Sequence, residues 1–340
     1  MFAVNALVPW LPAGRQHFAA PSASILFLAY FARQTQAMNH DSPFAALGNT
    51  RDTPEVEAQV AAIVRSFAPG HDLTRVGATF ELLDRAFDGN LGGYQKLKTL
   101  YHNRSHTNEV VLCTARMLHG LHLAGQGLDG EHIDAALIGA LMHDVGYLMS
   151  DEEASGTGAQ FTASHVMRGV EFTRRHLADL PPALLETTTK VIMLTDHRKH
   201  PGWVSFDNLQ QQRAAYATAT ADLIGQMANR EYLERVLLLY FEFEEARMGG
   251  FADIHDLLEK TTAFYRMTKG RLDQDLNGMS VCLARHFGQQ AGAERNFYQE
   301  SIDRNLDYLD RVVKTEREHR LERLRRGHVV EKVLDLNAAH

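Results

Sequence analysis

Cysteine is scarce in this chain of 340 residues, which contains only Cys113 and Cys282. Two thiols cannot form a disulfide scaffold or a four-thiolate zinc site, and this usage fits a reducing cytoplasm. No stretch of the sequence reaches the roughly 18 to 20 apolar residues that a membrane-spanning helix needs. The sequence therefore predicts a cytoplasmic protein without a membrane partner, in which both cysteines pack between helices.

Positive charge is not in excess either, because 35 Lys and Arg residues against 42 Asp and Glu residues give a formal net charge of −7. That balance does not favour a broad contact with extended nucleic acid. Alternating polar and apolar segments with Asn-Gly or Asp-Gly turns, which are typical of β-hairpins, are missing as well. Hydrophobic residues make up 45% of the chain, so disorder over most of it is excluded.

Helical periodicity runs through nearly the whole sequence. At residues 54–68, apolar side chains recur with a 3.6-residue spacing behind a Thr53-Pro54 pair that suits a helix start. Glycine and proline clusters separate further segments of the same kind. The other expected helices cover residues 76–88, 105–123, 131–143, 164–178, 182–196, 210–227, 230–246 and 253–268. The sequence therefore predicts an all-α fold.

Histidine is abundant, with 18 residues, and several of them lie on apolar helices. His102 and His106 are four residues apart, which puts both imidazoles on one face of a helix. A helix that starts at Asn103 explains this segment equally well when it is taken alone. His143 and Asp144 end an apolar helix, where their burial is costly unless a partner such as a metal ion binds them.

Three later residues extend this pattern. His165 lies on a helix with an apolar face, His197 ends an apolar run, and Asp222 lies among alanines. Each of them alone is commonly a satisfied core residue or a helix cap. Together with the earlier residues they predict five helices that each carry a buried His or Asp, and a shared metal centre would remove the cost of that burial. Imidazole and carboxylate groups suit zinc, iron, manganese or magnesium.

The order H…HD…H…H…D resembles that of the HD-domain metal-dependent phosphohydrolases, which are all-helical proteins with a metal site at the centre of the bundle. YHNRSHTNEV is similar to the YHNxxHAxDV signature of their class I cyclic-nucleotide phosphodiesterase branch. LTDHRKH looks like the ATDxxxH segment of that branch, and TADL like its CADL segment. The resemblance covers residues 95–225 and implies an HD-type bundle that holds one or two divalent ions (Mn, Mg, Zn or Fe).

The resemblance also implies a role for each matched residue. A first ion would be held by His106, His143, Asp144 and Asp222, and Asp144 would bridge to a second ion completed by His165 and His197. His102 matches the general acid, Glu109 matches a carboxylate that orients a ligand imidazole, and Asn103 and Asp196 match supporting positions. The implied reaction is hydrolysis of a small phosphoester or nucleotide by a metal-activated hydroxide, with a proton from His102 for the leaving group.

The sequence departs from the phosphodiesterases at Tyr147, where their next histidine falls, and their nucleotide-clamping Gln and Phe have only Gln226, Phe251 and Phe264 as candidates. Cyclic-nucleotide specificity therefore does not follow. Two other functions stay open. The same ligand order occurs in HD-domain oxygenases, whose mixed-valent iron pair uses oxygen to cleave C–C or C–P bonds. A helical protein that binds a nucleotide or a partner without turnover is the third possibility.

Three parts of the chain are expected. Residues 1–45 form an N-terminal extension with little order, residues 46–270 the HD-type catalytic domain, and residues 271–340 a C-terminal helical extension. We interpret residues 1–37 as an upstream over-extension before Met38, although residues 22–32 can also be read as a poor signal peptide. The basic run REHRLERLRRGH, which starts at Arg317, predicts a solvated or self-associating helix that would support a homo-oligomer, with an anion site as the alternative.

Overall fold

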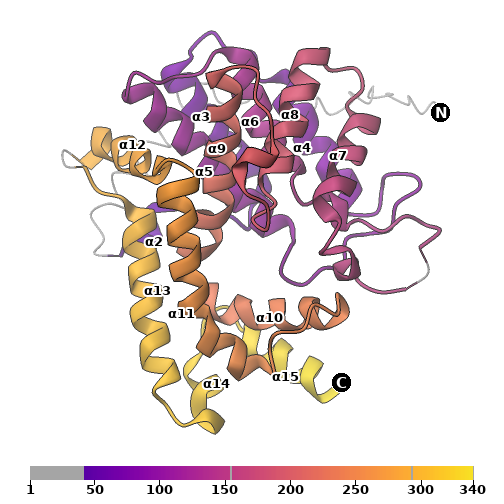
Figure 1. Cartoon of the computed structure of the whole chain (residues 1–340), viewed down its shortest axis with the longest axis vertical. Coiled ribbons are helices and arrows are strands. Elements are labelled where there is room, and N and C mark those ends of the chain that lie inside the picture. The colour runs from indigo at the N-terminus through magenta and orange to yellow at the C-terminus, as the bar shows by residue number, and fades with distance from the viewer. Residues whose placement is uncertain (1–41, 154, 292–293, 340) are drawn as a thin grey trace, which may run out of the picture.

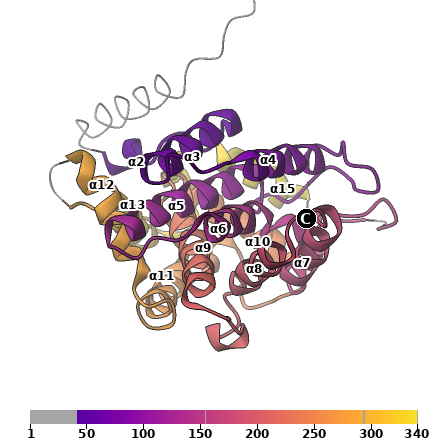
Figure 2. The same cartoon turned by 90° about the horizontal axis from the view of Figure 1, so that it is seen from above.

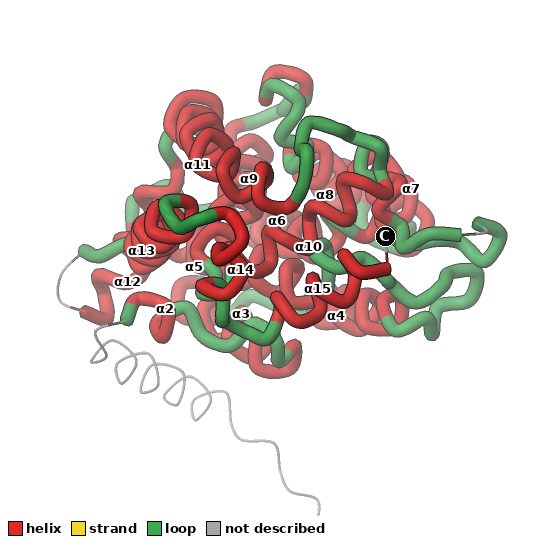
Figure 3. The backbone as a smooth tube through the Cα atoms, turned by 90° about the horizontal axis from the view of Figure 1, so that it is seen from below, coloured by secondary structure: helices red, strands yellow, loops and turns green. Residues whose placement is uncertain are grey.

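The computed structural model describes residues 42–339 except 154 and 292–293, and this part consists of helices and loops (Figure 3). It contains no strand, only a single antiparallel bridge between Tyr94 and Ser150. The expected all-α fold is therefore confirmed. The interpretations made for residues 1–37 lie outside the described residues.

All nine helices expected from the sequence are present, and each end lies within two residues of its expected position. They are α3 (Thr53–Phe67), α4 (Thr74–Phe87), α5 (Arg104–Leu123), α6 (Gly130–Met142), α7 (His165–His176), α8 (Pro182–Leu194), α9 (Leu209–Ala228), α10 (Tyr232–Glu245) and α11 (Ile254–Gly270). At the start of α3 the N-cap is Asp52 rather than Thr53, since the Asp52 carboxylate accepts a hydrogen bond from the backbone N–H of Glu55.

The centre of the molecule is formed by helices that are buried on nearly every side. In α5 all residues from His106 to Leu121 are buried, and in α6 all residues from His132 to Met142. Such helices have no solvent face and belong in the middle of a bundle. Figure 2 shows α3 and α4 on one side of this centre and α8 and α9 on the other, and α5 packs against α3, α6 and α9.

Helices from the C-terminal third pack against this bundle. α10 lies across its lower end, while α11 and α13 (Phe297–Val313) stand side by side at its flank (Figure 1). α12 (Cys282–Ala291) packs on α5, α13 also contacts α2 (Pro43–Ala46), and α15 (Val329–Ala339) packs on α10. The short helical turns are η1 (Val145–Tyr147), η2 (Ala159–Phe161), η3 (Pro201–Trp203), η4 (Arg271–Asp275), η5 (Met279–Val281), η6 (Arg317–His319) and α14 (Arg320–Arg323).

The prediction that the basic run at residues 317–328 forms one helix is wrong. The chain makes the two short turns η6 and α14 there and then becomes extended at Leu324, whose side chain is buried. Arg326 lies over the ring of Tyr308 at 4.3 Å and donates to Asn305 Oδ1 at 3.1 Å. These contacts hold the segment against α13, so tertiary packing overrides its helical pattern.

The fold also bears on the expectations for membrane-spanning helices and for the two cysteines. None of the described helices combines the length and the apolar composition that crossing a bilayer requires. Cys113 and Cys282 are both free and buried, which agrees with a packing role.

Candidate metal centre

The start of α5 positions the first two histidines. Asn103 is its N-cap, and the side-chain oxygen accepts hydrogen bonds from the backbone N–H groups of Ser105 and His106 at 3.0 and 3.4 Å. Its amide nitrogen donates to the carbonyl of Leu100 at 2.8 Å. Asn103 therefore fixes the turn that places His102 just before the helix and His106 in its buried first turn.

The end of α6 and the start of α7 bring the next candidate ligands together. α6 stops at Met142, so His143 and Asp144 project from the point where the buried helix ends. α7 packs on the following turn η1, and the guanidinium of Arg168 donates to the carbonyl of Gly146 at 2.9 Å. This packing sets His165, the first residue of α7, beside Asp144.

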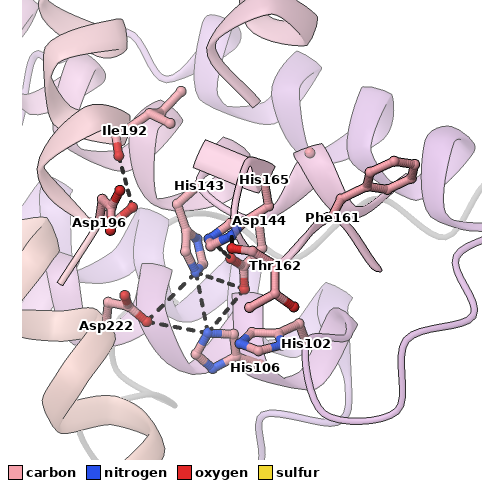
Figure 4. Close-up of polar contacts among 12 residues, drawn as sticks. His102, His106, His143, Asp144, Phe161, Thr162, His165, Ile192, Asp196 and Asp222 are labelled. Atoms are coloured by element: carbon pink, nitrogen blue, oxygen red, sulfur yellow. Dashed lines mark hydrogen bonds and ion pairs between the residues drawn. The ribbon is translucent and has the colours of Figure 1, made fainter. Parts of the chain in front are cut away.

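Four side chains converge on one point inside the bundle, as Figure 4 shows. His106 Nε2 lies 3.2 Å from His143 Nε2, and 3.3 Å from both Asp144 Oδ2 and Asp222 Oδ1. His143 Nε2 lies 3.1 Å from Asp144 Oδ2 and 3.7 Å from Asp222 Oδ1. Ligand atoms about 2.1 Å from one ion stand roughly 3.0 to 3.4 Å apart in octahedral or tetrahedral geometry. The spacing and the donor types of His106, His143 and Asp144 therefore fit a single divalent ion, and Asp222 Oδ1 lies within 3.7 Å of both imidazoles.

Backbone carbonyls orient two of the imidazoles. His143 Nδ1 lies 2.8 Å from the carbonyl oxygen of Ala140, and His165 Nδ1 lies 2.8 Å from that of Thr162. A carbonyl only accepts hydrogen bonds, so each Nδ1 carries a proton and each Nε2 is the nitrogen that faces the centre. His165 Nε2 is 3.6 Å from Asp144 Oδ1, while Asp144 Oδ2 faces His106 and His143. Asp144 thus presents one oxygen to each group, as a bridging carboxylate would.

Burial and charge have opposite effects on these side chains. Burial lowers the pKa of His106, but hydrogen bonding and attraction to Asp144 and Asp222 outweigh burial and raise it to about 10. The pKa of His143 is raised in the same way despite burial, mainly by Asp144. Burial alone would raise the pKa of Asp144, yet the adjacent imidazoles hold it well below its usual range. A divalent ion binding here would therefore displace protons.

His197 and Asp196 are placed differently from the other expected residues. His197 lines the same cavity but is exposed, and it makes no hydrogen bond or ion pair with the described ligand side chains. Asp196 is buried, and its carboxylate accepts from the guanidinium of Arg198 at 2.8 and 2.9 Å. Arg198 also donates to the carbonyl of Ala163 at 2.9 Å. Asp196 therefore anchors the loop that carries His197.

Glu109 does not make the contact expected of it. Its Oε1 accepts from Arg235 Nη1 at 2.5 Å and from Asn229 Nδ2 at 2.6 Å, and no imidazole in the described part of the chain donates to it. The guanidinium of Arg235 lies 5.6 Å from the ring centre of Tyr101. Glu109 thus neutralises a buried arginine beside the centre instead of orienting a ligand.

Glu242 is a site residue that no sequence pattern predicted. His102 Nδ1 lies 2.5 Å from Glu242 Oε2, and Glu242 Oε1 accepts from the backbone N–H of Tyr101 at 2.6 Å. Glu242 is on α10, 140 residues from His102, and its side chain is buried. A carboxylate bound at Nδ1 fixes the ring and leaves Nε2 for the cavity. The sequence feature that could have indicated it is an acidic residue flanked by Phe241 and Phe243, just as Asp222 was recognised as an acidic residue among apolar neighbours.

Tyr147, the residue that departs from the phosphodiesterase pattern, stacks against two imidazoles whose ring centres lie 6.3 Å apart. Its ring is 4.6 Å from that of His102 at an angle of 18°, and 4.5 Å from that of His165 at 13°. Burial raises the pKa of its hydroxyl well above the usual value, so Tyr147 stays neutral at physiological pH. Tyr147 thus contacts both His102 and His165, which lies beside Asp144.

A cavity of about 440 Å³ opens beside the four side chains. His106, Asp144, His165 and Asp222 line one end of it, with His102 and Tyr147 beside them. The other end is lined by α10, α11 and the loop between them, and it includes Phe251 and Phe264. A larger cavity of about 590 Å³ lies elsewhere, near Arg51 and Glu231, and none of the expected metal ligands lines it.

Comparison with known proteins adds one partial match. A protein-family model described as Npun_R2479-like matches residues 148–280. The match covers less than half of the chain and begins after Asp144, so it includes His165, His197 and Asp222 but not His106 or His143. None of the curated proteins compared with the chain matches it.

Proposed function

We propose that the protein is a metal-dependent phosphoester hydrolase with an HD-type catalytic bundle. The observation that carries the proposal is the convergence of His106, His143, Asp144 and Asp222 at ligand spacing next to the His102–Glu242 pair. The cavity thus combines a set of side chains that can bind a cation with an imidazole that is positioned to transfer a proton. Ester hydrolysis needs both of them.

Each side chain has a defined task in this proposal. When bound, one or two divalent ions (Mn, Mg, Zn or Fe) would provide hydroxide at neutral pH and offset the charge of the phosphate. The four ligands hold that position, and Asp144 presents its second oxygen toward His165. His102 Nε2 donates a proton to the leaving alkoxide, and Glu242 keeps the ring oriented through Nδ1.

The pair formed by His102 and Glu242 favours hydrolysis over oxygen chemistry on the same ligands. An alkoxide leaving group needs a proton donor on its side of the phosphorus, and a carboxylate at Nδ1 supports the protonated imidazole that supplies it. Elemental analysis of the purified protein and an assay of oxygen uptake separate the two functions. Iron content together with oxygen consumption on a phosphonate or polyol would establish the oxygenase instead.

The decisive experiment compares esters with good and poor leaving groups. His102→Ala should keep the metal content of the parent protein and reduce turnover of an alkyl phosphodiester by about 10² to 10⁴-fold. Turnover of bis(4-nitrophenyl) phosphate should fall much less, because nitrophenolate leaves without a proton. His328→Ala is the matched control, since His328 is an exposed histidine of the C-terminal segment. Equal losses on both esters would rule out proton donation by His102.

A further inference from the structure

The outer half of the cavity is apolar, and several of its side chains are not buried in the core. Met248 and Met267 are 45% and 64% exposed, and Phe251 and Phe264 are partly exposed. Phe251 also stacks on Phe243, with ring centres 5.6 Å apart and an angle of 9°. Large apolar side chains that remain accessible on a concave surface are typical of a binding site for an apolar ligand.

Gln226, the residue considered for reading a nucleobase, is already engaged. Tyr101 donates its hydroxyl to Gln226 Oε1 at 2.5 Å, and Gln226 Nε2 donates to the backbone carbonyl of Asp222 at 3.0 Å. The amide is thus held at both ends, one turn after a metal ligand on α9. Turning this amide toward a base edge would break both hydrogen bonds and leave their partners unpaired.

Three more polar side chains of the cavity have hydrogen-bond partners within the protein. Thr195 and Thr261 each donate their hydroxyl to a carbonyl one turn earlier in the chain, at 2.8 Å. Lys260 donates to Asp256 Oδ2 and to the carbonyl of Gly250, both at 2.8 Å. A sugar or base would find both hydroxyl protons and two of the three N–H groups of Lys260 engaged, whereas a hydrocarbon needs no donor.

We propose that the cavity takes a phosphoester whose organic group is an extended hydrocarbon. The phosphate would lie at the metal end, and the chain would run along α10 and α11 past Phe264 and Met267. This inference rests on the proposed function for the phosphate end only. A cavity of about 440 Å³ is within the range of sites for small molecules.

Binding of non-hydrolysable alkylphosphonates tests this directly, with the protein as purified and with calorimetry as the readout. Along the series ethyl-, butyl- and hexylphosphonate, Kd should fall about four-fold for each added methylene. Met267→Asp should weaken hexylphosphonate more than tenfold and leave ethylphosphonate nearly unchanged. Leu209→Asp is the matched control, because Leu209 is a 55% exposed residue at the start of α9, outside the cavity lining.

The outcomes separate the two proposals. If Kd does not depend on chain length, or if adenosine 5′-monophosphate binds more tightly than hexylphosphonate, the hydrocarbon inference is wrong. Cleavage of the phosphodiesters would in that case still support the hydrolase. If chain length matters but no ester is cleaved with any of the four metals, the hydrolase fails and the apolar site stands.

Discussion

Gly146 lies so close to α7 that a Cβ atom added to it would come 1.9 Å from the carbonyl oxygen of His165. It would also come 2.7 Å from the backbone nitrogen of Gly169. The absence of a side chain at Gly146 is therefore what allows η1 and α7 to touch, and that contact sets the distance between Asp144 and His165.

Gly146→Ala should separate these elements. We expect the free energy of unfolding to fall by about 2 kcal/mol or more, because backbone atoms cannot yield to a new methyl group. Gly70→Ala is the control, since no atom lies within 4 Å of the position of its added Cβ. Urea unfolding of the two variants measures the difference. Equal stability of both variants would contradict the close packing of η1 on α7.

Asp144→Asn and Asp222→Asn should each lose metal, because an amide is a poor substitute for a carboxylate between two imidazoles. Asp134→Asn is a matched control: Asp134 is a buried carboxylate 2.8 Å from His71 Nε2, outside the site. That variant should lose stability but keep its metal. Elemental analysis after gel filtration measures the metal content of all three variants. Retention of metal by Asp222→Asn would show that Asp222 is not a ligand.

Metal binding should depend on pH. The pKa of His106 is raised to about 10 by Asp144 and Asp222, so at pH 7 an incoming ion must displace its proton. Affinity should therefore rise with pH up to about 10, and calorimetry in buffers of different ionisation enthalpy should show at least about one proton released per ion. A pH-independent affinity would contradict protonation of this group.

The same shift predicts how the stability of metal-free protein varies with pH. A histidine whose pKa is raised by folding stabilises the fold fully below its unfolded value near 6.5, and this contribution is lost as the pH rises through about 10. Chelator-treated protein should accordingly become less stable between pH 7 and 10. Urea unfolding across this range measures whether the free energy of unfolding falls as the pH rises, with Asp222→Asn as the comparison.

Glu242→Gln should act through His102. The variant keeps an acceptor for Nδ1 but removes the negative charge, so turnover of an alkyl phosphodiester should fall about 10 to 100-fold while metal content stays constant. Glu234→Gln is the matched control, because Glu234 is a buried glutamate on the same helix that accepts from the backbone of Arg326. A similar loss in both variants would indicate a structural effect of α10 instead.

The sequence predicted local structure far better than long-range contacts. Apolar spacing and breakers located nine helices, because these signals lie within each segment. Four candidate ligand positions, His106, His143, Asp144 and Asp222, were predicted from acids and imidazoles on apolar helices, and the structure brings their side chains together. The partner of His102 was not found, since Glu242 lies 140 residues away and nothing local links the two. The basic run at 317–328 was wrongly predicted to form one helix, because tertiary packing buries Leu324 in an extended conformation.

The cavity is assembled from two separate parts of the fold. Helices α5, α6, α7 and α9 supply the end with the candidate metal ligands, whereas α10, α11 and their connecting loop supply most of the apolar wall. On the proposed function, substitutions in α10, α11 and their connecting loop would therefore change which organic group binds without altering the candidate metal ligands. Relatives of this chain with the same histidines and aspartates but different side chains at 248, 264 and 267 would be expected to catalyse the same reaction on substrates with different organic groups.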